Sequence, residues 1–134
     1  MVSSILTFEE TDAPFRADPA HSFTMPARFY TSAEVYELEK DAIFYKTWHY
    51  ACHVSQVSQP GSFFSTKIHE QNLFITRGKD NELRAFYNVC AHRGHELVEG
   101  SGRKSLITCP YHAWTFDLQG NLVSARNSEN VANF

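Results

Sequence analysis

Two short pairs, each a cysteine followed by a histidine, constrain this chain more than any other feature of its 134 residues. Cys90 and His92 enclose one residue, Cys109 and His112 enclose two, and 16 residues separate the pairs. Each pair follows a stretch with strand character, "AFYNVC" and "SLITC", and so falls at the start of a turn. A hairpin-like return of the chain would bring the two turns together around one metal centre.

The residues alone leave three interpretations of these pairs. Two thiolates and two imidazoles suit a tetrahedral structural zinc ion, although zinc modules usually keep their two cysteines together. One cysteine and one histidine from each of two loops also suit a [2Fe–2S] cluster with Cys₂ on one iron and His₂ on the other. In the third interpretation the cysteines are buried apolar residues and the histidines lie near a surface turn. The order and spacing favour the cluster.

The composition and charge exclude several classes of function. Hydrophobic residues make up 43% of the chain and aromatic residues 14%, which is typical of a folded domain. The formal net charge of −3 leaves no basic stripe for phosphates, so we expect no nucleic-acid partner. No signal peptide opens the sequence and no run of 18 apolar residues exists, so we expect no membrane span. Three cysteines make a poor disulfide framework, which favours a cytoplasmic chain.

The N-terminal part of the chain has little strand character. Residues 1–25 show no clear period and are predicted to form an extended arm. Thr31 and Glu34 have the spacing of a capping box, and apolar residues then recur at helical spacing. We therefore expect a helix over about residues 32–46.

From Trp48 onward, short runs of β-branched and aromatic residues alternate with turn clusters. The runs are WHYACHV (48–54), GSFFSTKI (61–68), NLFITRG (72–78), LRAFYNV (83–89), SLITC (105–109), WTFDL (114–118) and NLVSA (121–125). Closely spaced short strands are typical of an antiparallel sandwich or a small barrel. The sequence therefore predicts a mainly β domain over 26–134, with the helix leading into it.

The strings "CAHRGHEL" and "CPYHAWTFDLQGNL" resemble the Rieske signature of the non-haem iron ring-hydroxylating oxygenases, C-x-H-R followed by C-x-x-H-x-W. The resemblance implies an antiparallel Rieske-type [2Fe–2S] sandwich. It also implies that Cys90 and Cys109 bind the inner iron, and that His92 and His112 bind the solvent-facing iron.

The resemblance covers residues 25–134, which look like the N-terminal part of an oxygenase α subunit. The branch that acts on quaternary ammonium compounds carries similar strings around both pairs. The resemblance implies electron transfer from a flavin-containing reductase or a ferredoxin to a mononuclear non-haem iron. That iron would carry out O₂-dependent hydroxylation or N-demethylation, and in the family the α subunits form a homotrimer.

The mononuclear iron needs two histidines and a carboxylate, which the family places in a C-terminal catalytic domain. No histidine follows His112, and the only carboxylates after it are Asp117 and Glu129. We therefore expect this chain to be the cluster domain without the catalytic iron site. Two alternatives stay open: a stand-alone Rieske ferredoxin that carries electrons, and a zinc-stabilised binding module.

Three further residues beside the pairs are expected to support the cluster. The resemblance places Arg93 near the cluster and in contact with a neighbouring domain. Tyr111 and Trp114 flank His112, and we expect them to pack over the cluster and shield it from water. Cys52 has no partner cysteine, so we expect a small buried apolar residue in the strand 48–54.

Overall fold

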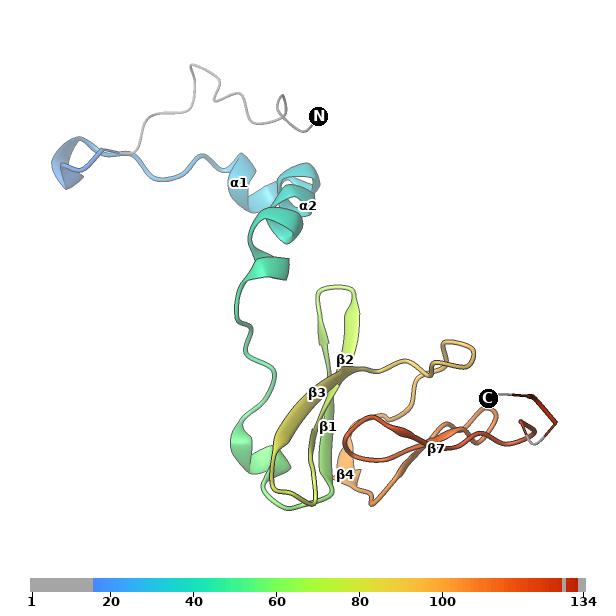
Figure 1. Ribbon diagram of the computed structural model, residues 1–134. Coiled ribbons are helices and arrows are strands. Elements are labelled where there is room, and N and C mark those ends of the chain that lie inside the picture. Colours follow the sequence, from blue (N-terminus) through green and yellow to red (C-terminus); the bar gives the residue numbers. More distant parts are fainter. Residues whose placement is uncertain (1–15, 129, 133–134) are drawn as a thin grey trace. The chain divides into compact units, whose positions relative to one another are not determined.

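The computed structural model describes residues 16–128 and 130–132 (Figure 1). The chain divides into two compact units, the first ending at Trp48 and the second beginning at His49. Residues 1–15 of the expected arm lie outside the described residues. A domain boundary at residue 26 stays a prediction.

The described part of the first unit is mainly helical. Its elements are η1 (Pro19–His21), α1 (Arg28–Thr31), α2 (Ala33–Ala42) and η2 (Phe44–Lys46). The helix expected over about 32–46 is therefore shorter, because Ile43 leaves helical geometry with φ −123° and ψ −64°. No helix in the described ranges is long and apolar enough to cross a membrane.

The expected capping residue of this helix was wrong by one position. Ser32 caps α2, and its hydroxyl accepts a hydrogen bond from the backbone N–H of Val35 at 3.3 Å. Thr31 instead ends α1, and its hydroxyl donates to the carbonyl of Ala27 at 3.1 Å. Both residue types cap helices well, so the sequence alone did not distinguish them.

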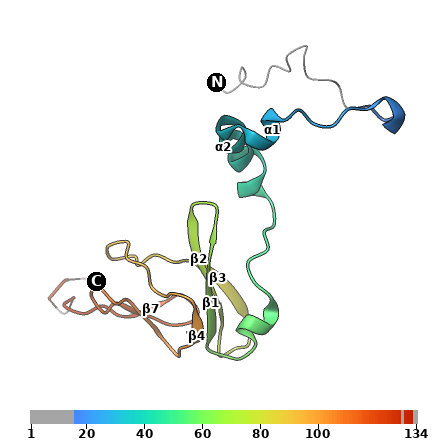
Figure 2. The ribbon, with the colours of Figure 1, turned by 180° about the vertical axis from the view of Figure 1, so that it is seen from behind.

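The strands of the second unit form two antiparallel sheets (Figures 1 and 2). They are β1 (Ser62–Ile68), β2 (Gln71–Arg77), β3 (Leu83–Tyr87), β4 (Ser101–Arg103), β5 (Ile107–Thr108), β6 (Thr115–Phe116) and β7 (Leu122–Ser124). The larger sheet has the order β3-β2-β1-β4 and the smaller one β5-β6-β7. This arrangement confirms the expected mainly β, antiparallel fold.

Two parts of the strand prediction were wrong. Residues 48–54 form no strand, and the chain there leads into the 3₁₀ turn η3 (Val54–Val57), which is capped by His53. Conversely, β4 pairs with β1 where the glycine-rich sequence predicted only a turn. Gly102 favours this pairing, because a Cβ there would lie only 3.1 Å from the Phe63 ring across the sheet and the ring would have to shift.

The core of the second unit contains both cysteines of the candidate site. Its buried members are Phe63, Phe74, Cys90, Leu97, Val98, Ile107, Cys109 and Leu118, and the partly buried Phe86, Trp114 and Phe116 pack against them. Strands from both sheets contribute to this cluster. The two candidate cysteine ligands are therefore held in a close-packed core, which constrains their side-chain positions.

Candidate metal centre

Two loops of the second unit carry the candidate ligands, and their backbones have the same frame. We call residues 90–95 loop 1 and residues 109–114 loop 2. In loop 1 the N–H of Cys90 donates to the carbonyl of His95 at 2.8 Å. In loop 2 the N–H of Cys109 donates to the carbonyl of Trp114 at the same distance. Each loop is thus a closed six-residue turn that begins with a cysteine.

The fifth residue of each loop completes the frame. The N–H of Gly94 donates to the carbonyl of Cys90 at 2.8 Å, and that of Ala113 donates to the carbonyl of Cys109 at 3.0 Å. Both residues have positive φ, 70° for Gly94 and 60° for Ala113. Glycine adopts this conformation freely, whereas an alanine is strained there.

The frame directs backbone N–H groups at the cysteine of loop 1. Cys90 is 2% exposed, and the N–H groups of His92 and Arg93 bond to its sulfur. Burial raises the pKa of the Cys90 thiol, while these two N–H groups act in the opposite direction and the neighbouring Cys109 thiol raises it further. The two sulfurs are therefore close enough to interact with each other.

The cysteine of loop 2 receives N–H groups from the same two positions of its loop. Cys109 is also 2% exposed. Burial by itself raises the pKa of its thiol, but the N–H groups of Tyr111 and His112, together with Cys90, outweigh burial and hold the pKa below its ordinary value. N–H groups that favour a thiolate are the expected surroundings of a metal-bound sulfur.

The two candidate histidines meet between the loops. Their rings, those of His92 and His112, lie edge to face with centroids 4.8 Å apart. Burial lowers the pKa of His112, and the charges of His92, Arg93 and His95 lower it further. Both effects favour the neutral imidazole, which is the form that binds a metal.

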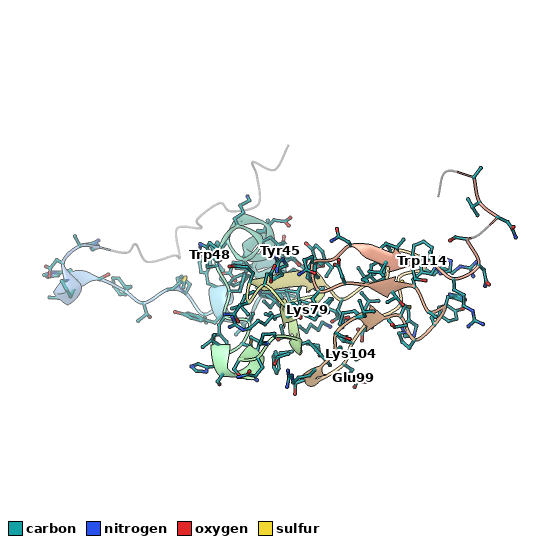
Figure 3. All side chains as sticks on the ribbon, turned by 60° about the horizontal axis from the view of Figure 1, so that its bottom comes forward. Tyr45, Trp48, Lys79, Glu99, Lys104 and Trp114 are labelled. Carbon is teal, nitrogen blue, oxygen red and sulfur yellow. The ribbon has the colours of Figure 1, made fainter. Side chains whose placement is uncertain are left out.

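Two aromatic side chains of loop 2 lie against these histidines. Trp114 stacks on the ring of His92, with centroids 4.8 Å apart and an interplanar angle of 9°. Tyr111 lies against His112 with centroids 3.8 Å apart, and its own side chain is 56% exposed. Figure 3 labels Trp114 in the C-terminal part of the second unit, and its ring also packs against the core. His92 is thus covered by the packed ring of Trp114, whereas His112 is covered by the more exposed ring of Tyr111.

The donor set fits a [2Fe–2S] cluster. Nδ1 of His112 is buried and has no hydrogen-bond partner in the described part of the chain, as expected of a nitrogen that serves as a ligand. Among the described residues, no three His, Cys, Asp or Glu side chains are grouped to hold one metal ion. A Rieske cluster makes no such demand, because each iron takes only two side chains.

The other residues singled out in the sequence lie in different surroundings. Arg93 is exposed, and its backbone N–H rather than its guanidinium is directed at Cys90. Cys52 is only half-buried and lies outside any strand, so the expectation of a buried strand residue was wrong. His49, a histidine outside both pairs, lies edge to face with His69, with centroids 5.4 Å apart.

Asn88 is a site residue that the sequence analysis missed. It is 5% exposed and lies two residues before Cys90. Its Oδ1 accepts hydrogen bonds from the N–H groups of Leu97 at 2.9 Å and Val98 at 3.1 Å. Its Nδ2 donates to the carbonyl of Val98 at 2.7 Å. The only signal in the sequence was a polar residue at the end of an apolar run.

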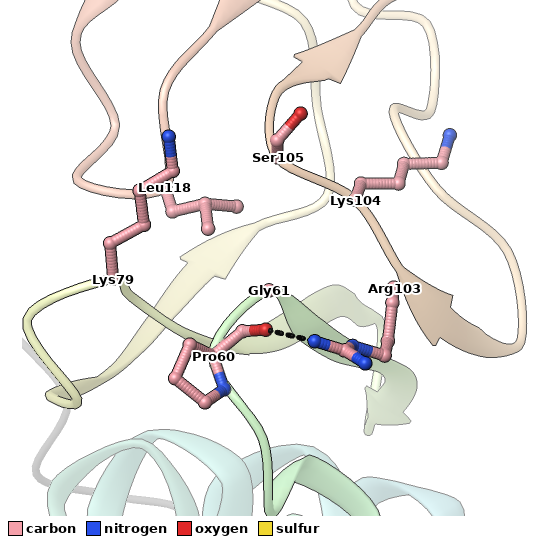
Figure 4. Close-up of a pocket in the computed structure, with 7 residues that line it drawn as sticks. All are labelled: Pro60, Gly61, Lys79, Arg103, Lys104, Ser105 and Leu118. Atoms are coloured by element: carbon pink, nitrogen blue, oxygen red, sulfur yellow. Dashed lines mark hydrogen bonds between the residues drawn. The ribbon is translucent and has the colours of Figure 1, made fainter.

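A separate cavity of about 290 Å³ lies among the residues just before β1, the end of β4, the β2–β3 turn and the β6–β7 turn (Figure 4). Basic side chains contribute to its lining: Lys79, Arg103 and Lys104. Arg103 is turned toward Pro60, and its Nη2 donates to the Pro60 carbonyl at 3.1 Å. None of the residues that line this cavity belongs to loop 1 or loop 2, so the cavity is not part of the candidate centre.

Comparison with known proteins decides among the interpretations of the two loops. The Rieske [2Fe–2S] domain family matches residues 47–134, which include all four candidate ligands. The chain belongs to the Rieske [2Fe–2S] domain family. Its cofactor is therefore a [2Fe–2S] cluster, and the family does not support the zinc module.

The Rieske domain of this chain has relatives among oxygenase subunits. The chain is 52% identical over 127 residues to the carnitine monooxygenase oxygenase subunit of Acinetobacter baumannii, covering 94% of this chain and 34% of that protein. It is 38% identical over 108 residues to the chloroplastic choline monooxygenase of Amaranthus tricolor, covering 81% and 24%. The chain thus spans about a third or less of the length of these relatives.

Solved structures give the same relationship. A quaternary ammonium Rieske monooxygenase in complex with L-carnitine superposes with a TM-score of 0.80 at 54% identity, covering 84% of this chain and 32% of that one. Naphthalene 1,2-dioxygenase from Rhodococcus superposes with a TM-score of 0.76 at 30% identity, covering 81% and 25%. The Rieske fold expected from the two motifs is confirmed.

Proposed function

We propose that this chain is the electron-relay domain of an oxygenase α subunit that acts on quaternary ammonium compounds. Cys90 and Cys109 hold one iron of the cluster, and His92 and His112 hold the other. The observation that carries the proposal is the shared frame of loops 1 and 2, which brings two buried thiols and two adjacent imidazoles together. When bound, the cluster accepts and returns one electron at a time.

The residues around the ligands have separate tasks in this proposal. The N–H groups of the third and fourth residues of each loop stabilise the cysteine sulfurs as thiolates. Trp114 holds the His92 ring in one plane and keeps water from that side. Tyr111 leaves the His112 side closer to solvent, since more than half of its side chain is exposed.

An oxygenase subunit is favoured over a stand-alone ferredoxin by the extent of the match. The similarity to the carnitine monooxygenase subunit covers 94% of the chain and so includes most of the first unit as well as the Rieske domain. A free-standing carrier needs no such preceding segment. The relatives act on carnitine and choline, which supports a trimethylammonium compound as the substrate and hydroxylation or N-demethylation as the reaction.

We propose the same partners that the family uses. A flavin-containing reductase or a ferredoxin donates the electrons. The acceptor is a mononuclear non-haem iron held by residues outside this sequence, because no histidine follows His112. A related structure is described as revealing inter-subunit electron transfer, which supports transfer between neighbouring α subunits of a homotrimer. We place the protein in the cytoplasm.

The ligand assignment is tested by spectroscopy on the purified protein. The wild-type protein should contain two irons and two sulfides per chain and show the visible absorption of a Rieske cluster. Cys90→Ala and Cys109→Ala should each lose that absorption, and Cys52→Ala is the matched control that should retain it. A Cys90→Ala protein with the full wild-type spectrum would disprove the assignment.

The oxygenase assignment needs a separate test. The natural protein, supplied with a reductase and O₂, should consume carnitine or another trimethylammonium compound and release a demethylated or hydroxylated product. Electron transfer from the reductase without consumption of any such compound would leave only the carrier function.

A further inference from the structure

The bases of the two loops are closed by different means. Loop 2 is the turn of the β5–β6 hairpin, in which Ile107 pairs with Phe116 and Thr108 with Thr115. A backbone ladder therefore continues directly from the loop and fixes its two ends. The hydroxyl groups of Thr108 and Thr115, 3.1 Å apart, add a further contact across this base.

Loop 1 lacks such a ladder. β3 ends at Tyr87, and residues 95–99 after the loop belong to no strand within the described chain. Leu97 and Val98 are nevertheless buried in the core beside both cysteines, at 8% and 6% exposure. Their backbone polar groups need partners, because a buried amide without a hydrogen bond is costly.

The side chain of Asn88 supplies those partners. One amide group satisfies the N–H groups of Leu97 and Val98 and the carbonyl of Val98, with distances between 2.7 and 3.1 Å. The backbone N–H of Asn88 is itself anchored, since it donates to the carbonyl of Asn72 on β2 at 2.8 Å. The residues before loop 1 and the residues after it are thus tied together and to the larger sheet.

We infer that Asn88 is a positioning residue for the cluster, doing for loop 1 what the β5–β6 ladder does for loop 2. It does not bind iron. It holds the base of loop 1 closed so that Cys90 and His92 reach the same centre as the ligands of loop 2. This inference rests on the proposed ligand assignment and adds the residue that keeps half of the ligands in place.

The test compares Asn88→Ala and Asn88→Asp with two matched controls in the natural protein loaded with its cluster. Thr115→Val removes the side-chain contacts of Thr115 to the Thr108 hydroxyl and to the Ala113 carbonyl of loop 2, but keeps the backbone ladder. Asn72→Ala removes an exposed contact to the residue that follows loop 1, the hydrogen bond from Asn72 Nδ2 to Glu96 Oε1 at 2.5 Å. The readouts are the rate of iron loss to a chelator, the midpoint potential and the visible circular dichroism of the cluster.

Asn88→Ala should release iron about tenfold faster than wild type or more, with a shifted potential and altered circular dichroism, because three buried backbone groups lose their partner. Asn88→Asp should fall between Ala and wild type, since it keeps acceptors for the two N–H groups but loses the donor to Val98. Both controls should stay within about twofold of wild type.

Wild-type iron release, potential and circular dichroism in Asn88→Ala would overturn the inference while leaving the ligand assignment intact. A wild-type protein without a [2Fe–2S] cluster would instead overturn the proposed function. Should the variants not fold, hydrogen exchange on the wild-type protein decides the matter. The N–H groups of Leu97 and Val98 should exchange as slowly as those of the β5–β6 ladder, and exchange as fast as that of exposed loop amides would overturn the inference.

Discussion

Loops 1 and 2 have the same backbone frame, yet each presents its histidine from a different position. In both loops the N–H groups of the third and fourth residues point at the cysteine sulfur. The histidine is the third residue of loop 1, His92, but the fourth residue of loop 2, His112. The frame therefore serves the sulfurs, and the two histidine rings lie edge to face although they start from different positions of their loops.

The largest expected effect comes from making the loops alike. The double variant His92→Arg with Arg93→His moves the histidine of loop 1 to the position used in loop 2. It should abolish the visible absorption of the cluster, because the moved ring starts from a different Cα and leaves the face of Trp114. The single variant Arg93→His keeps the original ligand and should retain the cluster.

A double variant that retains the full visible absorption of the cluster would show that loop 1 can bind iron through a histidine at either position. In that case the different positions in the two loops would carry no structural meaning.

The aromatic neighbours of the two histidines should differ in their contribution to stability. Trp114→Ala removes a half-buried ring that packs on the core and on His92, and should lower the free energy of unfolding by about 2–3 kcal/mol, less than the ~3–5 kcal/mol of a fully buried ring. Tyr111→Leu should cost less than about 1 kcal/mol, since its side chain is 56% exposed. Chemical denaturation monitored by far-ultraviolet circular dichroism measures both, and equal losses would contradict the difference between the two sides.

Substitutions of the fifth residue of each loop, Gly94 and Ala113, should change the stability of the protein by a smaller amount. Gly94→Ala should destabilise by about 1–2 kcal/mol through its positive φ alone, because a Cβ there would meet nothing nearer than Val89 at 4.0 Å. Ala113→Gly relieves the same strain but adds freedom to the unfolded chain, so it should stay within about 1 kcal/mol of wild type. Urea unfolding checks both, and a neutral Gly94→Ala would mean that loop 1 can relax out of the shared frame.

The smallest expected effect on stability comes from the ion pair between Asp80 and Arg84, which lies outside both loops and serves as a control for them. The Arg84 guanidinium beside Asp80 lowers the pKa of that carboxyl to about 2. A carboxyl whose pKa is depressed by folding contributes stability above its unfolded pKa and loses it as the pH falls toward the folded value. Between about pH 4 and pH 2 the wild-type protein should therefore lose its small advantage in melting temperature over Asp80→Asn. An advantage that does not shrink between pH 4 and pH 2 would contradict the ion pair.

The sequence predicted best what depends on local pattern. Strands β1 and β3 lie within the expected runs and β2 begins one residue before its run, at Gln71, because their apolar residues alternate or cluster between clear turns. The Rieske family followed from the residue types and order of the two Cys–His pairs.

What the sequence did not predict depends on long-range contacts. β4 pairs with β1, and Gly102 fits closely over the ring of Phe63, a residue far away in the chain. In the sequence Asn88 is only a polar residue at the end of an apolar run, and its role depends on Leu97 and Val98 folding back against it. The sequence also did not reveal that the two loops share one backbone frame. When the cysteines of the two loops are aligned, the histidines fall at different positions.

Electron–nuclear double resonance on the chemically reduced protein tests the central claim most directly. With ¹⁵N-labelled histidine, the account predicts a single [2Fe–2S] signal coupled to two histidine nitrogens. His92→Ala and His112→Ala should each abolish that two-nitrogen signal, and His49→Ala should leave it unchanged. Coupling to one nitrogen or to none in the wild-type protein would contradict a cluster held jointly by loops 1 and 2.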